Sequence, residues 1–112
     1  MTVKDLQSKL KLKALNKVTD KEIEGAFVSD MLSDVMAGAQ AGSVWVTVQT
    51  HKNIIAAANL VDVPAIIIVR GKKVPEDTLQ MADRVGVTVF GTDLDSFKVA
   101  VSLYQAGIKP VG

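Results

Sequence analysis

Two short and almost uninterrupted apolar runs constrain the fold of this chain more than any other feature. Residues 43–48 read Ser-Val-Trp-Val-Thr-Val, and residues 65–69 read Ala-Ile-Ile-Ile-Val. Runs of this length, rich in β-branched side chains, are typical of strands that are covered on both faces of a sheet. A segment with helical character follows each run. We therefore expect strand and helix to alternate around a buried sheet.

The alternation extends in both directions from these two runs. The sequence predicts a further strand at residues 24–28 and a last short strand at residues 87–90. Helices are expected after the four strands, over residues 31–38, 53–61, 75–86 and 92–107. Strands that are separated by helices pair in parallel through right-handed crossovers.

The N-terminal part predicts two more elements. Residues 3–10 have one apolar stripe and form a helix capped by Thr2. Lysines alternate with apolar residues over 9–17, which is typical of an edge strand protected against unwanted pairing. The sequence thus predicts one α/β domain over residues 1–112. It has three layers, with a mostly parallel sheet covered by helices on both faces.

The composition excludes several classes of protein. Hydrophobic residues make up 48% of the 112 residues, which excludes a disordered chain. The 13 basic residues nearly balance the 12 acidic ones, so we expect no nucleic-acid partner. The chain has no cysteine, which excludes disulfides and thiolate metal sites. It shows neither a signal peptide nor a membrane span, so we expect a cytoplasmic protein with no membrane partner.

Polar residues cluster at three corners where a predicted strand gives way to a helix. In a parallel sheet such corners lie at the carboxyl ends of strands, where ligands bind to the N–H groups of helix starts. The same residue types also serve as ordinary helix N-caps. The candidate ligand-binding residues are, in chain order, Ser29, Asp30, Ser33, Asp34, Thr47, Gln49, Thr50, His51, Asn53, Thr92 and Asp93.

The middle corner, residues 47–53, is the strongest candidate for a ligand site. Its five consecutive polar residues, from Gln49 to Asn53, exceed what one N-cap requires. At the first and third corners, capping is the preferred interpretation. His51 is the single histidine, a residue type that can serve as an acid, a base or a phosphate contact. A hydrogen bond at a helix start is an equally common role for such a residue.

The chain carries no motif for catalysis or for a cofactor. The phosphate loop, the glycine-rich dinucleotide motif and the nucleophile elbow are all absent from the sequence. With one histidine and no cysteine, a zinc site is not expected. Aspartates at helix starts complement the helix dipole, which explains them without a magnesium ion. We expect no catalytic residue, no metal and no cofactor.

The helix expected from Asn53 to Val61 is apolar on nearly every side. A helix with this pattern is buried on more than one face. A domain of this length offers little material to cover it, so the pattern predicts a homodimer that packs through this helix across a twofold axis.

Three segments of the chain resemble the DRTGG domain. They are Ser29-Asp-Met-Leu-Ser-Asp-Val-Met-Ala37, Trp45-Val-Thr47 and Gln49-Thr-His-Lys-Asn-Ile-Ile-Ala-Ala57, within a similarity that spans about residues 3–105. That domain occurs beside the catalytic parts of HPr kinase/phosphorylase-like proteins and of some phosphotransacetylases, and with CBS domains. It also forms small free-standing proteins, some encoded near iron hydrogenase components.

The resemblance implies an α/β regulatory or ligand-binding module. The residues that match its motif positions are Ser29, Asp30, Ser33, Asp34, Thr47, Gln49, His51 and Asn53. Kinase activity is not implied, because the chain has no phosphate loop and no room for a catalytic domain.

Three hypotheses of function follow. The first is a non-catalytic regulatory module that binds a small anionic or nucleotide-like ligand at the strand-to-helix corners. The second is a protein-interaction subunit that docks on a redox enzyme such as an iron hydrogenase. The third, the least favoured, is a small phosphotransfer or hydrolytic enzyme that uses His51 with Asp30 or Asp34.

Overall fold

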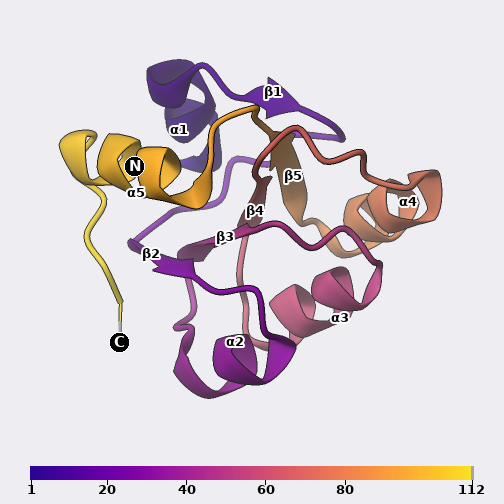
Figure 1. Cartoon of the computed structure of the whole chain (residues 1–112). Helices are drawn as coiled ribbons and strands as arrows, with labels where there is room; N and C mark the ends of the chain where they lie inside the picture. The colour runs from indigo at the N-terminus through magenta and orange to yellow at the C-terminus, as the bar shows by residue number, and fades with distance from the viewer. Residues whose placement is uncertain (112) are drawn as a thin grey trace.

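Strands and helices alternate along most of the chain (Figure 1). In the computed structural model, residues 1–111 of the chain are described. The elements are α1 (Val3–Leu10), β1 (Lys13–Ala14), β2 (Gly25–Val28), α2 (Leu32–Gly38), β3 (Ser43–Thr47), α3 (Asn53–Leu60), β4 (Ala65–Ile68), α4 (Glu76–Val85), β5 (Thr88–Gly91) and α5 (Ser96–Gln105).

The strands form one five-stranded sheet in the order β1-β5-β4-β3-β2. The four strands from β2 to β5 pair in parallel, and β1 runs antiparallel to β5 at the edge. The predicted parallel sheet and the predicted lysine-rich edge strand are both confirmed. The edge strand is shorter than expected, because only Lys13 and Ala14 pair with β5.

Helices cover both faces of the sheet, so the predicted three-layer α/β class is confirmed. Alternate strand residues point to opposite faces, as the period of two requires. Trp45 and Ile66 belong to the core under α2, α3 and α4, whereas Val44 and Ile67 belong to the core under α1 and α5. Figure 1 shows the two helical layers, with α1 and α5 on one side and α2, α3 and α4 on the other.

The order of the strands decides which face of the sheet each helix covers. From β2 to β5 each parallel strand lies beside the one before it, so right-handed crossovers place α2, α3 and α4 on one face. After β5 the chain passes to the opposite face, where α5 packs. The connections after β4 and β5 therefore lead to helices on opposite faces of the sheet, the change of direction at which ligands bind in many α/β folds.

The C-terminal residues protect the other edge of the sheet. The backbone N–H of Ala26 donates to the carbonyl of Lys109 at 3.0 Å, and the N–H of Val111 donates to the carbonyl of Ala26 at 3.1 Å. Residues 109–111 therefore run along β2 and satisfy backbone groups that an open edge would leave unpaired.

The start of α5 differs from the expectation. The sequence predicts that Thr92 and Asp93 begin this helix, but the helix begins at Ser96, and Asp95 is its N-cap. The Asp95 carboxylate accepts a hydrogen bond from the Lys98 N–H at 2.9 Å. Thr92 and Asp93 instead lie in a loop that continues the pairing with β4, because the Thr92 N–H donates to the Ile68 carbonyl.

Helices α3 and α5 differ in how their apolar residues are placed. In α3, Ile54, Ile55, Ala57 and Ala58 are buried in the core between α2 and α4, whereas Leu60 is exposed. In α5, Phe97, Val101 and Tyr104 recur at helical spacing, and all three are exposed to solvent. The residues of α5 that enter the core are Val99 and Leu103.

Candidate functional site

The corner after β3 is fixed by a group of internal hydrogen bonds. The Thr47 hydroxyl donates to Asp30 Oδ1 at 3.0 Å, and the Val48 N–H donates to the same oxygen at 2.9 Å. The Gln49 side-chain amide donates to the Asp30 carbonyl, and its backbone N–H donates to Thr47 Oγ1 at 3.2 Å. Asp30, Thr47 and Gln49 thus join the ends of β2 and β3. Their polar atoms hold the corner together.

Two further features of this corner follow from its burial. Thr47 is fully buried, so its hydroxyl cannot reach a ligand at the surface. The Gln49 Oε1 atom is buried and has no hydrogen-bond partner among residues 1–111. A buried acceptor without a donor is costly, and a ligand or water donor would satisfy it.

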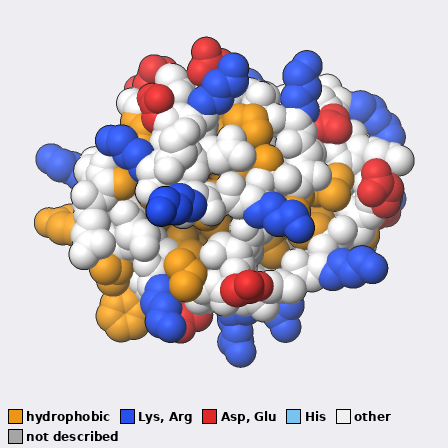
Figure 2. All heavy atoms as spheres, turned by 90° about the horizontal axis from the view of Figure 1, so that it is seen from above, with side chains coloured by type: hydrophobic (Ala, Val, Ile, Leu, Met, Phe, Trp, Pro, Cys, Tyr) orange, Lys and Arg blue, Asp and Glu red, His pale blue; other side chains and the backbone are white. Residues whose placement is uncertain are grey.

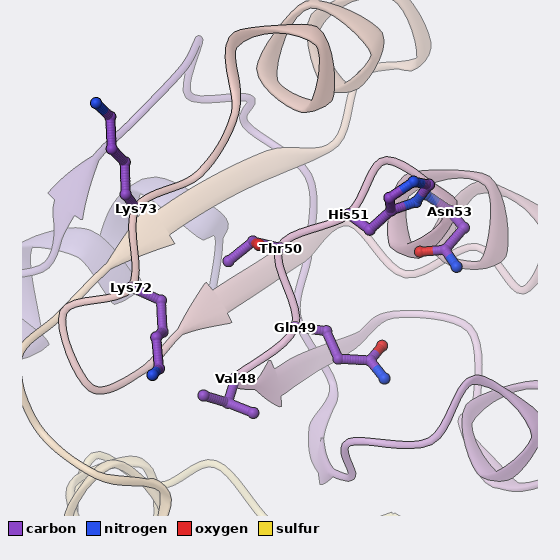
Figure 3. Close-up of a pocket in the computed structure, with 7 residues that line it drawn as sticks. All are labelled: Val48, Gln49, Thr50, His51, Asn53, Lys72 and Lys73. Atoms are coloured by element: carbon purple, nitrogen blue, oxygen red, sulfur yellow. The ribbon is translucent and has the colours of Figure 1, made fainter.

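An open depression of about 560 Å³ lies between this corner and the loop after β4. Figure 3 shows this depression, with Thr50 projecting toward the loop and the side chains of Lys72 and Lys73 extending from the loop in opposite directions. We call it the β3 depression, and its lining residues are Val48, Gln49, Thr50, His51, Asn53, Lys72 and Lys73. Its volume lies within the range of small-molecule sites.

Four of the predicted site residues meet in the β3 depression: Gln49, Thr50, His51 and Asn53. Thr50 is held in place because its carbonyl accepts a hydrogen bond from the buried Thr78 hydroxyl at 2.9 Å. His51 Nδ1 accepts the Asn53 N–H at 3.2 Å. In the neutral imidazole this bond leaves the proton on Nε2, so the ring presents a donor away from the backbone.

The first N–H groups of α3 are not free to bind an anion. The Ile54 N–H donates to the His51 carbonyl and the Ile55 N–H donates to the Lys52 carbonyl, both at 3.0 Å. With the Asn53 N–H bonded to His51, the first turn is satisfied internally. An anion in the β3 depression must therefore be held mainly by side chains.

Lys72 and Lys73 supply positive charge, which the predicted set of site residues lacks. They follow β4 in the run Arg70-Gly-Lys-Lys, which the sequence pattern indicates only as a turn. The rule that ligands gather at the carboxyl ends of parallel strands applies to this run as well, and it is the signal that would have identified both lysines. No carboxylate lines the β3 depression, so its charge is positive.

The first predicted corner lies outside the β3 depression. Ser29 accepts the Met31 N–H at 3.1 Å and donates to Asp34 Oδ2 at 3.3 Å. Ser33 and the two aspartates of this corner are likewise not among the residues that line the depression. Neither Asp30 nor Asp34, which the phosphotransfer hypothesis pairs with His51, lines the β3 depression. The Asp30 carboxylate instead accepts hydrogen bonds from Thr47 and Val48.

The third predicted corner contributes to a different cavity. Thr92 and Asp93 line a depression of about 510 Å³ at the end of β5. We call it the β5 depression. It touches the β3 depression at one residue, because Lys72 lines both.

Residues 1–111 contain no cluster of three or more histidine, cysteine, aspartate or glutamate side chains able to hold one metal ion. No helix in this part of the chain is both long enough and apolar enough to span a membrane.

A mostly parallel sheet between two helical layers, with polar depressions at its carboxyl edge, defines a three-layer α/β domain. The model of the DRTGG domain matches residues 5–106. The chain therefore belongs to the DRTGG domain family, as its sequence motifs predicted.

Comparison with solved structures supports the fold. The chain is similar to the CBS and DRTGG domains of the regulatory region of Clostridium perfringens pyrophosphatase, a structure complexed with the activator diadenosine tetraphosphate. The TM-score is 0.71 and the sequence identity is 19%. The match covers 94% of this chain and 46% of the other, so the chain spans about half the length of that structure. None of the curated proteins compared with the chain matches it.

Proposed function

We propose that this protein is a non-catalytic regulatory module that binds a small anionic or nucleotide-like ligand in the β3 depression. The observation that carries the proposal is that two lysines, Lys72 and Lys73, line the same depression as the polar segment after β3. Phosphate groups would be held by the lysine ammonium groups, and Thr50, His51 and Asn53 would orient the rest of the ligand. The charge of the lining favours an anion over a neutral ligand.

The comparison with the pyrophosphatase region is consistent with this proposal. That regulatory region was crystallised with a nucleotide activator, diadenosine tetraphosphate, and it contains a DRTGG domain of the same fold. A regulatory role needs a ligand but no reacting groups, and this fits a depression that is lined by His51 but by no carboxylate.

Thermal unfolding in the presence of AMP, ATP and diadenosine tetraphosphate tests the proposal. A ligand that binds the native state stabilises it by about 2.7 kcal/mol at 100 times Kd. This corresponds to a rise of several degrees in Tm for a domain of this size. Lys73→Ala and His51→Ala are expected to weaken the ligand response.

Lys4→Ala serves as the matched control, because Lys4 is an exposed lysine of α1 outside both depressions. The same loss of charge at Lys4 is expected to leave ligand binding nearly unchanged. A Tm that responds to none of the nucleotides, or a response as large in Lys73→Ala as in the unmodified protein, would refute the proposed site.

A second candidate function is a protein-interaction module, and one observation favours it. Helix α5 exposes Phe97 and Tyr104 at 77% and 72% of their surface, with Val101 between them. Exposed apolar side chains that share a helix face are typical of contact surfaces. That the partner is a redox enzyme stays a prediction from the resemblance.

The homodimer through α3 also stays a prediction. The outward side of α3 is small and carries Ala56, Asn59 and Leu60, of which Leu60 is 67% exposed. If this surface forms the twofold contact, Leu60→Asp lowers the mass measured by sedimentation from dimer to monomer. An unmodified protein that sediments as a monomer at micromolar concentration would exclude the dimer.

A further inference from the structure

The β5 depression is formed by parts of the chain that are distant in sequence. Lys13 of β1 lies opposite Gly91 of β5 in the antiparallel register. Gly91 has no side chain, and the Leu15 side chain packs over it, since an added Cβ would meet Leu15 Cδ1 at 3.2 Å. Gly91 and Leu15 both line the depression. Lys11, after α1, and Lys72, after β4, complete the walls.

The charge of the β5 depression is strongly unbalanced. Three ammonium groups, those of Lys11, Lys13 and Lys72, face a single carboxylate, that of Asp93. Within residues 1–111, the ion pair found joins the Met1 amino group to Glu22, so none of the three lysines is paired with an acidic group. Figure 2 shows basic side chains spread across the face where β4 and β5 end.

A backbone seam separates this depression from the β3 depression. The Arg70 N–H donates to the Leu94 carbonyl and the Gly71 N–H donates to the Thr92 carbonyl, both at 2.8 Å. These bonds join the loop after β4 to the loop after β5 beyond the end of the sheet. The seam residues Gly71, Thr92 and Leu94 line the β5 depression and not the β3 depression, so the two depressions can hold two different groups.

We propose that the β5 depression is a second binding site, for an anion of the phosphate class that carries two or more negative charges. Lysine binds phosphate as a mobile point charge, whereas planar bidentate recognition of a carboxylate is the role of arginine. Three lysines from three elements therefore fit a compact multivalent anion such as inorganic pyrophosphate. Thr92 Oγ1 accepts the Leu94 N–H at 3.2 Å, which leaves its hydroxyl proton free for the anion.

The site does not depend on the function proposed for the β3 depression, and variants separate the two. Titration with inorganic pyrophosphate, followed by the backbone amide signals in NMR, is the experiment. Saturable shifts at Gly91, Thr92 and Asp93 are expected. Lys13→Ala should weaken this binding by about five- to tenfold, since one of the contacting charges is lost. Lys73→Ala, which alters only the β3 depression, should leave it nearly unchanged.

One further variant and two control variants distinguish a specific site from general attraction between charges. Asp93→Asn should tighten pyrophosphate binding a few fold, because it removes the one opposing carboxylate. Asp62→Asn changes the net charge equally at the opposite, amino end of β4 and should have little effect. Lys4→Ala should likewise leave binding unchanged.

Three results would overturn the second site. The first is the absence of shifts at Gly91 and Thr92. The second is a set of shifts confined to residues 49–53, which would place the anion in the β3 depression alone. The third is a set of unsaturated shifts that potassium chloride reproduces at equal ionic strength, which would show only screening.

Discussion

Arg70 is held in a backbone conformation that few residues with a side chain adopt. Its φ is 64°, and Gly71 follows with a φ of 63°. Two left-handed residues in succession reverse the chain directly after β4, and this reversal presents Lys72 and Lys73 at the edge of the sheet. The left-handed region costs a residue with a Cβ about 1–2 kcal/mol, but asparagine tolerates it better.

Arg70→Asn is therefore expected to stabilise the protein by up to about 1 kcal/mol. Denaturation in urea measures the change, and the m-value should stay constant. Lys73→Asn is the matched control. It also removes a positive charge from this exposed loop, but Lys73 is not in the left-handed region. An equal gain from both variants would assign the effect to charge and not to backbone strain.

Asp5 is the residue at which pH should act on the N-terminal helix. The Thr2 N–H donates to the Asp5 carboxylate at 3.0 Å, and the Asp5 N–H donates to Thr2 Oγ1 at 3.2 Å. The hydrogen bond from the Thr2 backbone, aided by the Thr2 hydroxyl, lowers the pKa of Asp5. The folded state thus binds the proton more weakly than the unfolded state.

The sign of the pH effect follows from this direction. The contribution of Asp5 to stability is fully present above the ordinary aspartate pKa of about 3.9. It is lost as the pH falls from there through the lowered pKa of the folded protein. An NMR titration of the Asp5 carboxyl carbon should give a midpoint below the ordinary value. A midpoint at or above that value would contradict the capping box as the cause.

At the scale of the element, α5 has two faces with opposite consequences for mutation. Leu103 is buried under the sheet at 2% exposure, whereas Phe97 is 77% exposed. Leu103→Ala should cost about 2–5 kcal/mol of the free energy of unfolding, because it opens a cavity in the core. Phe97→Ser should change it by no more than about 0.5 kcal/mol. Urea denaturation of both variants checks the contrast, and a large loss for Phe97→Ser would show that its side chain is covered in solution.

The sequence predicted the elements whose residues carry a local signal. The runs at 43–48 and 65–69 identify β3 and β4 because their composition suits only a strand buried on both faces. Gly86 marks the end of α4, and its φ of 75° confirms the cap. These features depend on residues close in sequence, so they can be predicted from the sequence alone.

The predicted start of α5 was wrong because the actual start depends on residues that are distant in sequence. Thr92 and Asp93 have the same capping potential as Asp95 and Ser96. The competition is decided by β4, since Gly71 and Ile68 hold Thr92 in a continuation of the pairing between β5 and β4. The predicted set of site residues lacked Lys72 and Lys73 for the same reason. Lys72 enters both depressions through the fold and not through any motif.

At the scale of the whole molecule, the C-terminal residues close the sheet at β2. Gly25 is required there, because an added Cβ would meet Val111 Cγ1 at 2.2 Å and the Lys109 carbonyl at 3.0 Å. A side chain at this position would push the C-terminal segment away from β2 and expose its edge to other chains.

Gly25→Ala is accordingly expected to destabilise the protein by about 1–3 kcal/mol through overpacking. Hydrogen exchange should speed up at the Ala26 and Val111 amides, which bond across this contact. Val111→Ala removes the closest clashing atom, so the double variant should recover part of the loss. Unchanged exchange at both amides in Gly25→Ala would show that the segment does not depend on the glycine.

The sharing of Lys72 by the two depressions has a thermodynamic consequence. One ammonium group cannot hold two separate anions at full strength, so an anion bound on one side of the seam lowers the affinity of the other side. By linkage the factor is the same in both directions. A single larger ligand that places negative groups on both sides avoids this antagonism. The protein would then distinguish ligands by the spacing of their charges.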